Sequence, residues 1–590
     1  MKQYNVILKK DVDYDSFWND IESDTDGGKL YIPNRAVQFT NERLGSLRQC
    51  WYLLTDEEAE LLRQDDRVYC VEIPPEFRTD IIMMPRVTQT GDFTKTTSDS
   101  GAFLNWGLIR SSNATNVYGT GTTTALNYEY TLDGTGVDVV TQDSGLQVDH
   151  PEFTDALGNT RVQQIDWGSY SGGTFTQNAN HYRDYDGHGT HCAGIACGKT
   201  YGWAKNARVY SQKLNGLEGA GDSGTGISIT YAFDAIKTWH TSKAGARPTV
   251  VNMSWGYGSG YNTVTSLTYR GTSYTDANTT GNASYRYTNY GLNSSGGSTT
   301  TYLANVRIGS VDTDIEEMIA AGIVVCIAAG NRATKIDVSG GTDYNNFVVT
   351  DGGTIYYQRG SSPYSDNALM VGSLDSTVYD ATNDQRATYS ETGPGVSIWA
   401  PGTNIMSATS TTNKWGAGSQ NYYLNASYRQ TNISGTSMAT PQVAGVAALV
   451  LQLNPTYTPA QIRTSLLNNA SSVLYTTGLT NDYSNTRSLL GSAQKILYSN
   501  YSAVSTTTTT TTSTSSTSTS TSTSTTTSTT TIPPCNQYLC KTERGGYLFW
   551  TDCVNGNRAY TLLNGGGRRI ISSRTYPTQE KGAKIMIEAI

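Results

Sequence analysis

Three short segments of the chain carry residue types that together could perform nucleophilic acyl transfer. Asp143 ends an apolar, strand-like run and stands at a turn, where backbone groups can hold its carboxylate. His188 lies between two glycines at the start of an expected helix. Ser437 begins an apolar helical run, beside backbone N–H groups that have no partner within a helix and can stabilise an oxyanion. A carboxylate, an imidazole and a hydroxyl are the groups of an Asp-His-Ser triad.

Each of these residues also has an ordinary structural explanation when it is taken alone. A turn or capping Asp is far commoner than a catalytic one. Ser437 suits a helix N-cap, and Pro441 in the first turns suits an ordinary helix start. Since the chain has only five histidines, finding both His188 and His191 in one short motif favours the chemical interpretation.

The segments around the three residues resemble the subtilisin-like serine peptidases (subtilases), and they occur in the chain order of subtilisin. They read Gln142-Asp143-Ser144-Gly145, Gly187-His188-Gly189-Thr190-His191 and Gly435-Thr436-Ser437-Met438-Ala439-Thr440-Pro441. The resemblance implies that Asp143, His188 and Ser437 form a catalytic triad that works through an acyl-enzyme intermediate. It implies a serine endopeptidase that needs no metal or organic cofactor and acts on protein or peptide substrates.

Further segments carry the same resemblance and imply the rest of the site. Ala328-Ala329-Gly330-Asn331 resembles the oxyanion-hole segment, which makes Asn331 the side-chain donor beside the Ser437 N–H. Ser254-Trp255-Gly256 resembles the substrate-binding strand, and Gly219-Ala220-Gly221 resembles the strand on the other side of the bound peptide. Substrate would then bind as an added β-strand. Residues 105–108 resemble the start of the mature domain, and residues 398–402 resemble another family landmark.

The elements that must position these residues indicate an α/β domain over residues 105–502. Apolar β-branched runs at 136–140, 249–253 and 323–327 alternate with helical patterns, which predicts a mostly parallel sheet. The resemblance implies the three-layer subtilisin-like form of this fold. Residues 257–309 and 410–432 are rich in Ser, Thr, Tyr, Asn and Gly, and we expect both to be surface insertions. The first either shapes the cleft or is an inert loop, and we favour the inert loop.

Residues 1–85 predict a small α+β domain with a split βαβ, ferredoxin-like layout. We expect strands at 4–10, 50–54 and 67–73, and helices at 14–22 and after Thr55, where Thr55 and Glu58 form a capping box. This region resembles the subtilase propeptide, which implies a zymogen whose own N-terminal domain acts as chaperone and intramolecular inhibitor. Residues 86–104 are polar and predict an exposed activation linker, where chains are readily cut.

The C-terminal part begins with a Ser/Thr-rich linker, residues 503–531, in which every residue from Ser505 to Thr531 is Ser or Thr. Such a segment cannot bury enough apolar surface to order itself. Residues 532–590 predict a small β module containing Cys535, Cys540 and Cys553. Three thiols do not complete a zinc site, so we expect one disulfide and one free thiol.

Composition excludes several classes of function. The 590 residues carry a net charge of −8, which argues against a nucleic-acid binder. The longest apolar runs are far shorter than the roughly 20 residues that span a bilayer, so we expect no membrane span. The N-terminus shows no signal-peptide pattern. Localisation stays open between a virion, as in a phage-encoded particle protein, and export by a non-classical route.

Metal binding is assigned to no residue. Subtilases often bind structural calcium, but the sequence shows no EF-hand loop, and the spacing of His188 and His191 lacks an H-E-x-x-H motif. Cys192 would lie near the active site, where thiol reagents could inhibit by crowding His188; a small buried residue is the favoured alternative.

Two hypotheses concern specificity and the class of function. Arg332 stands where many relatives have an acidic residue, and we hypothesise that it disfavours basic side chains in the first specificity pocket. The rival to an active peptidase is a structural or adhesive virion-type protein on an inactive subtilase scaffold. The intact set Asp143, His188, Asn331 and Ser437 favours the enzyme, because a retired protease would usually have lost one of them.

Overall fold

The computed structural model describes residues 1–9, 12–22, 37, 39–42, 49–72, 87–96, 103–172, 175–261, 264–274, 283–294, 302–350, 353–475, 483, 485–501 and six strands between 536 and 589. The chain forms two compact units, residues 1–83 with 507–590 and residues 84–506. The expected boundaries at 85, 104, 502 and 531 stay predictions.

The second unit is built on a seven-stranded sheet in the order β18-β17-β14-β9-β7-β8, with β19 also paired to β17. Neighbouring strands run parallel except for the antiparallel pair of β17 and β18. The strands are β7 (Asp138–Asp143), β8 (Arg208–Lys213), β9 (Thr249–Met253), β14 (Val324–Ala328), β17 (Leu369–Val378), β18 (Asp384–Arg386) and β19 (Ile398–Pro401). The predicted mostly parallel sheet is confirmed.

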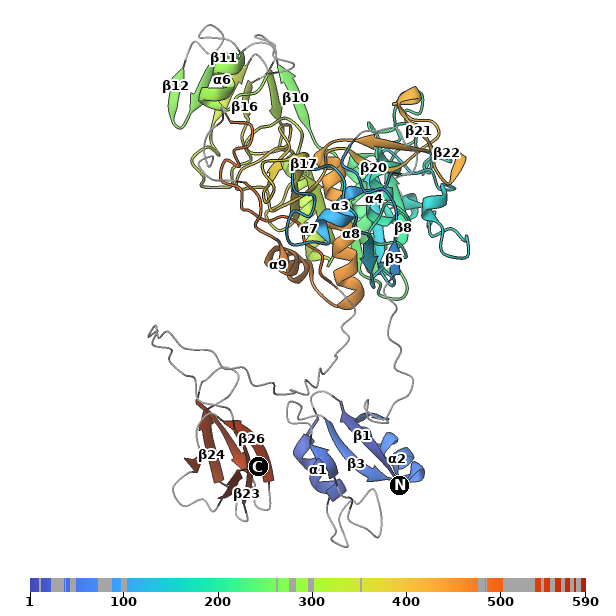
Figure 1. Cartoon of the computed structure of the whole chain (residues 1–590), viewed down its shortest axis with the longest axis vertical. Coiled ribbons are helices and arrows are strands. Elements are labelled where there is room, and N and C mark those ends of the chain that lie inside the picture. Colours follow the sequence, from blue (N-terminus) through green and yellow to red (C-terminus); the bar gives the residue numbers. More distant parts are fainter. Residues whose placement is uncertain are drawn as a thin grey trace, which may run out of the picture. The chain divides into compact units, whose positions relative to one another are not determined.

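Helices cover both faces of this sheet. Successive side chains of a strand point to opposite sides, so neighbouring residues of β7 pack in different cores. Val139 packs in one core with residues of α4 (His188–Cys197) and α8 (Thr436–Leu453). Val140 packs in a second core with residues of α5 (Ile229–Ser242) and α7 (Gly309–Ala320). The unit therefore has the three layers predicted for it (Figure 1).

Helix α8 is long and apolar enough to cross a membrane by length and composition alone. In this unit 89% of its residues are buried. It packs against β7, β9, β14, β17 and β19. Burial in the core thus accounts for its apolar sequence.

Shorter elements complete the unit. They are α3 (Trp106–Ser111), α9 (Pro459–Asn469), the 3-10 turns Pro151–Phe153, Trp167–Tyr170 and Gly416–Gly418, and the strands β5 (Val87–Gln89), β6 (Tyr128–Tyr130), β20 (Ile405–Thr409), β21 (Gln420–Tyr422) and β22 (Asn425–Ile433). Strand β22 lies between β20 and β21, so the expected insertion at 410–432 is a β-hairpin joined to the core strand β20.

Part of the expected activation linker is not exposed. Strand β5 pairs with β6, and Phe93 is only 2% exposed. The prediction of an exposed connector is therefore wrong for residues 93–95, which are buried, whereas residues 87, 88 and 90–92 are exposed as predicted. Residues 73–86 and 97–102 lie outside the described residues.

The insertion at 257–309 has its own secondary structure. Strands β10 (Gly258–Tyr261) and β13 (Tyr302–Asn305) form one pair. Strands β11 (Val264–Tyr269) and β12 (Thr272–Tyr274) join a four-stranded antiparallel sheet, β12-β11-β15-β16, with β15 (Phe347–Thr350) and β16 (Gly353–Tyr356). Helix α6 (Ala283–Tyr290) lies with these strands at one side of the unit (Figure 1).

The N-terminal region has a four-stranded antiparallel sheet in the order β2-β3-β1-β4 and two helices. The elements are β1 (Lys2–Leu8), α1 (Tyr14–Glu22), β2 (Phe39–Glu42), β3 (Gln49–Leu54), α2 (Asp56–Arg63) and β4 (Val68–Glu72). Thr55 caps α2, and Glu58 completes the predicted capping box. Val6, Leu54 and Leu62 are among the residues of its core.

The C-terminal region forms two three-stranded antiparallel sheets, β26-β23-β28 and β25-β24-β27. The strands are β23 (Asn536–Thr542), β24 (Gly546–Thr551), β25 (Arg558–Leu563), β26 (Arg568–Ser573), β27 (Thr578–Gln579) and β28 (Ile585–Ala589). Cys535, Cys553 and the linker at 503–531 lie outside the described residues, so the cysteine pairing stays a prediction.

Candidate active site

Asp143 and His188 meet at the carboxyl end of the parallel sheet. Asp143 is the last residue of β7, and His188 is the first residue of α4. Asp143 Oδ1 lies 2.8 Å from His188 Nδ1 and also accepts the Ser144 N–H at 2.7 Å. Since a carboxylate only accepts, the proton belongs on Nδ1, and Nε2 is left free to act as a base.

The buried carboxylate of Asp184 connects the end of β7 to the start of α4. Asp184 accepts the Ser144 hydroxyl at 2.9 Å, the Gly187 N–H at 2.8 Å and the Thr190 hydroxyl at 2.6 Å. The Ser144 hydroxyl in turn accepts the N–H of Gly189 at 2.8 Å. The turn after Asp143 and the first turn of α4 are thereby bonded to one side chain.

The environment of His188 favours its charged form. Burial alone would lower the pKa of His188, but the charge of Asp143 and the hydrogen bond to it outweigh burial, so this pKa lies well above its ordinary value of 6.5. The imidazole is thus a strong base that can take a proton from a neighbouring hydroxyl.

Cys192 lies against the site, in the position predicted for it. Its Sγ is 3.8 Å from His188 Nδ1 and 3.4 Å from the Ser437 carbonyl oxygen. Burial raises the pKa of this thiol, which keeps it protonated. Asp143, His188 and Cys192 place possible ligand atoms within 4.8 Å of one another. Because Asp143 and His188 bond directly to each other, we assign no metal there.

Ser437 is the second residue of α8 and is 8% exposed. Its hydroxyl donates to the Ser254 carbonyl oxygen at 3.0 Å, and its own carbonyl accepts the Ser254 hydroxyl at 3.0 Å. In this conformation the hydroxyl is engaged by Ser254 rather than by His188. Transfer of its proton to His188 therefore requires the hydroxyl to give up its hydrogen bond to Ser254.

Asn331 turns its amide nitrogen toward Ser437. Its Oδ1 accepts both the Thr436 N–H at 2.8 Å and the Thr436 hydroxyl at 3.0 Å, which identifies the other atom as Nδ2. A Cβ added at Gly435 would lie 3.3 Å from Asn331 Nδ2 and 3.6 Å from Ser437 N. Because Gly435 has no side chain, the space in front of these two N–H donors stays open, which suits an oxyanion.

The segment before Asn331 is fixed by α8 and by a buried loop. Gly330 donates its N–H to the Thr436 hydroxyl at 3.1 Å and accepts the Glu391 N–H at 2.9 Å. Gly330 has a φ of 118°, and an added Cβ would lie 2.8 Å from Glu391 Cγ. Ala328 ends β14, and Ala329 bonds to Val371.

His188, Asn331 and Ser437 line one cavity of about 470 Å³. The other lining residues are Lys414, Trp415, Asn432, Ile433, Ser434 and Met438. Sequence reasoning missed Lys414, Trp415 and Asn432, which come from the expected surface insertion at 410–432. A Trp within a polar stretch was the available signal.

The predicted peptide-binding segments lie in less regular structure than expected. Ser254, Trp255 and Gly256 follow directly after β9. Gly219, Ala220 and Gly221 form a turn rather than the predicted strand, with φ of 84° at Gly219 and 89° at Gly221. Both glycines adopt conformations that a side chain disfavours. Their contact with substrate stays a prediction.

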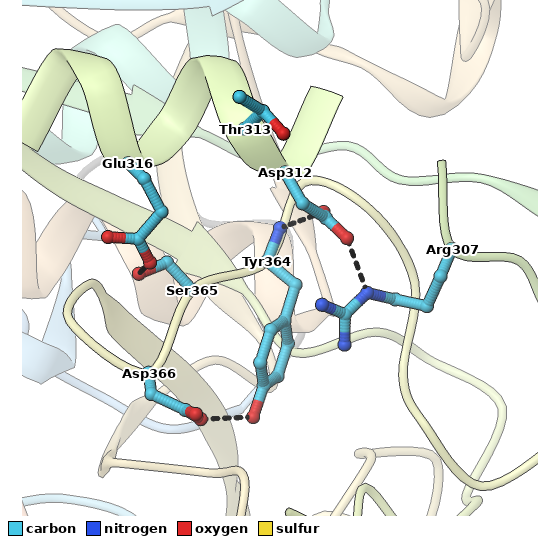
Figure 2. Close-up of a pocket in the computed structure, with 7 residues that line it drawn as sticks. All are labelled: Arg307, Asp312, Thr313, Glu316, Tyr364, Ser365 and Asp366. Carbon is cyan, nitrogen blue, oxygen red and sulfur yellow. Dashed lines mark hydrogen bonds and ion pairs between the residues drawn. The ribbon is translucent and has the colours of Figure 1, made fainter. Parts of the chain in front are cut away.

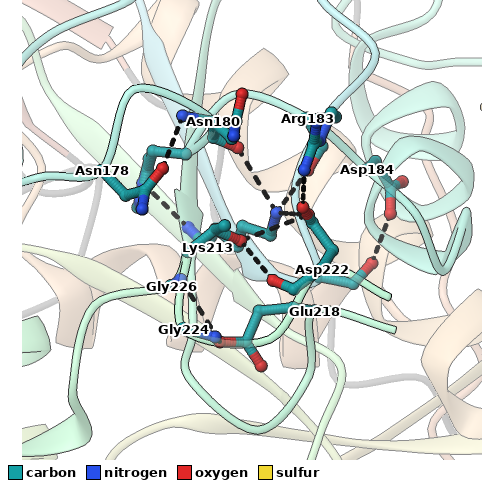
Figure 3. A network of polar contacts seen from close by, with 12 residues as sticks. Asn178, Asn180, Arg183, Asp184, Lys213, Glu218, Asp222, Gly224 and Gly226 are labelled. Carbon is teal, nitrogen blue, oxygen red and sulfur yellow. Dashed lines mark hydrogen bonds and ion pairs between the residues drawn. The ribbon is translucent and has the colours of Figure 1, made fainter. Parts of the chain in front are cut away.

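A polar network ties this turn to the loop before α4 (Figure 3). The Lys213 ammonium donates to the Arg183 carbonyl at 2.7 Å and bonds to the Asp222 carboxylate, which also bonds to Arg183. Burial lowers the pKa of Lys213. Glu218 accepts the Gly216 N–H at 2.6 Å and so closes the turn. The network supports the segment beside His188 without contributing to the cavity.

A second pocket of about 260 Å³ lies at the start of α7 (Figure 2). Arg307 donates to Asp312 at 2.7 Å, Asp312 accepts the Tyr364 N–H at 3.0 Å, and the Tyr364 hydroxyl donates to Asp366 at 2.7 Å. These groups satisfy one another, so we assign them a structural role.

Comparison with known proteins gives a consistent set of relatives. The model of the subtilase family matches residues 134–492, which contain Asp143, His188, Asn331 and Ser437. The extracellular serine proteinase of Thermus sp. (strain Rt41A) is 28% identical over 412 residues, 70% of this chain and 68% of that protein.

Two further relatives show how the lengths compare. Alkaline serine protease ver112 of Corniculantispora psalliotae is 30% identical over 401 residues, 68% of this chain and 70% of that protein. Alkaline serine exoprotease A of Vibrio alginolyticus is 27% identical over 446 residues, 76% of this chain; the chain spans 57% of the length of that relative.

Proposed function

The chain belongs to the subtilase family of serine endopeptidases, and we propose that Asp143, His188 and Ser437 are its catalytic triad. Ser437 Oγ attacks the scissile carbonyl while His188 Nε2 accepts the hydroxyl proton. His188 then protonates the leaving amine, and a water molecule hydrolyses the acyl-enzyme by the same steps in reverse. Asp143 holds the imidazole tautomer and stabilises its positive form. The mechanism uses no metal or organic cofactor.

The observation that carries this proposal is the pair of donors around the space at Gly435. The carbonyl oxygen of substrate becomes negative in the tetrahedral intermediate and needs preorganised donors. Asn331 Nδ2 and Ser437 N lie 3.3 and 3.6 Å from the position that a Cβ on Gly435 would take, so both donors lie on the open side of this glycine. Since Asn331 Oδ1 accepts the Thr436 N–H, a flipped amide would place its NH2 group against another donor, so the amide keeps this orientation. The amide is thus preorganised as an oxyanion-hole donor.

We further propose that substrate proteins or peptides bind as an extended strand between residues 254–256 and residues 219–221. The N-terminal region, residues 1–85, would act as an intramolecular inhibitor that the enzyme removes from itself.

The intact masses of the wild-type chain and of Ser437→Ala, expressed and purified side by side, test autoprocessing. We expect the wild type to lose an N-terminal piece that ends between Pro75 and Trp106, while the variant stays full-length. Casein hydrolysis by the same samples separates activity from processing. Uncut wild type that also leaves casein intact would favour the rival interpretation, an inactive scaffold.

A further inference from the structure

The three residues after Asn331 are bonded to the insertion at 257–309, far away in sequence. The Tyr287 hydroxyl of α6 donates to the Ala333 carbonyl at 2.7 Å. The Asn293 amide donates to the Arg332 carbonyl. In the opposite direction, the Arg332 guanidinium donates to the Ala304 carbonyl of β13 at 2.6 Å. Two consecutive carbonyls after Asn331 are therefore each held by a side chain of the insertion.

A fourth contact reaches the buried loop that holds Gly330. The Asn305 amide donates to Glu391 Oε1 at 2.8 Å and to the Thr334 hydroxyl at 3.0 Å. The Thr334 hydroxyl also bonds to the second oxygen of Glu391. Because Glu391 donates its N–H to Gly330, the insertion is linked to the residues on both sides of Asn331.

The backbone between these hydrogen bonds is strained. Ala333 has a φ of 56°, in the left-handed region that an alanine rarely adopts. Such a conformation persists only where the surroundings enforce it. The hydrogen bond from Tyr287 fixes the peptide plane after that residue. The plane before it is held by Asn293 and by the Ala333 N–H, which donates to the Tyr389 carbonyl at 2.8 Å. Without these hydrogen bonds, relaxation at Ala333 would shift the chain two residues from Asn331.

We infer that the insertion at 257–309 positions Asn331 for oxyanion binding, with Tyr287, Asn293 and Asn305 as positioning residues. The inference rests on the proposed function of Asn331. It replaces the expectation of an inert surface loop with a supporting role in catalysis. It also gives the Arg332 side chain a partner in the insertion, at the Ala304 carbonyl.

Steady-state kinetics of Tyr287→Phe and Asn293→Ala, on a peptide p-nitroanilide that the wild type cleaves, test the inference. Because displacement of a catalytic group by about 1 Å can cost up to ~100-fold, we expect kcat to fall roughly tenfold for each variant while KM stays within about twofold. Tyr285→Phe, on the same helix and 44% exposed, is the matched control and should keep the wild-type kcat.

A double-mutant cycle with Asn331→Ala shows whether the effect passes through Asn331. We expect Asn331→Ala alone to lower kcat by roughly 10²–10³. Adding Tyr287→Phe should then cost nothing more, because the group that it positions is gone. A full further loss in the double variant, or unchanged kcat in both single variants, would overturn the inference. If Asn331→Ala itself keeps the wild-type kcat, the proposed function fails instead.

A second variant keeps the test informative if loss of the hydrogen bonds reduces stability. Glycine adopts a φ of 56° without strain. Ala333→Gly added to Tyr287→Phe should therefore recover most of the lost kcat, since nothing drives the loop to relax. No recovery, at equal midpoints of urea unfolding, would contradict the role given to strain at Ala333.

Discussion

The two sides of the cavity are held in different ways. On the triad side, Asp143 and His188 are joined through Ser144, Asp184 and the first turn of α4, all close to the motifs in sequence. On the oxyanion side, Asn331 is followed by a strained segment that is bonded to Asn293 and Tyr287. These two residues lie 39 and 46 positions before their partners in the sequence. In the proposed account, local motifs position the base, whereas Thr436 and the long insertion, both distant in sequence, position the oxyanion-hole donor.

The largest expected effect is on the triad side. Asp143→Asn should lower kcat by about 10⁴, because an amide at this position favours the wrong tautomer of His188. The same change removes the charge that raises the pKa of His188. Activity needs neutral His188, so it rises with pH through this pKa. In the variant we expect the acid limb of kcat/KM to lie at lower pH than in the wild type; an unshifted limb would contradict the role given to Asp143.

Asp184→Ala should destabilise the triad side of the cavity. It leaves the Ser144 hydroxyl and the donors of Gly187 and Thr190 without their acceptor. We expect the free energy of unfolding to fall by roughly 3–5 kcal/mol, since each unsatisfied buried donor costs about 1–3 kcal/mol. Urea unfolding in a Ser437→Ala background avoids self-digestion. A loss below about 1 kcal/mol would show that Asp184 does not hold the two ends together.

Gly435→Ala tests the oxyanion side without touching a donor. The φ of Gly435 is 163°, an extended backbone that any residue adopts, so folding should be retained. The new methyl group would stand 3.3 Å from Asn331 Nδ2 and crowd the space in front of the two donors. We expect kcat to fall by roughly 10²–10³, as on removal of a donor. Wild-type turnover in this variant would place the oxyanion elsewhere.

Glu391→Gln has the smallest expected effect, and it tests the oxyanion side of the cavity through the pH dependence of the free energy of unfolding. Burial raises the pKa of Glu391 to about 7, above its ordinary value of 4.5. The folded wild type therefore holds a proton that the unfolded chain releases, and its free energy of unfolding falls between pH 4.5 and about 7, by up to roughly 3 kcal/mol. Glutamine cannot ionise, so in a Ser437→Ala background we expect this slope to flatten. Parallel pH profiles would contradict the assignment.

Sequence reasoning succeeded where contacts are local. The strand ends, the Thr55 capping box and the meeting of Asp143 with His188 follow from short patterns whose partners lie within a few residues or at one sheet edge. It failed where a side chain bonds to a distant carbonyl, because every carbonyl looks alike in sequence. The contacts of Tyr287 and Asn293 are of this kind. The backbone pairing of β5 with β6 and the place of Trp415 in the cavity also depend on partners distant in sequence.

The most direct test of the account is labelling of the purified chain with a fluorophosphonate, followed by mass-spectrometric mapping of the modified residue. A serine activated by His188 and backed by an oxyanion hole reacts with this electrophile. We expect modification at Ser437 in the wild type and none at Ser437 in Asp143→Asn over the same time. A folded, processed wild type that stays unlabelled at Ser437 would contradict the account and favour a scaffold that has kept the fold without the chemistry.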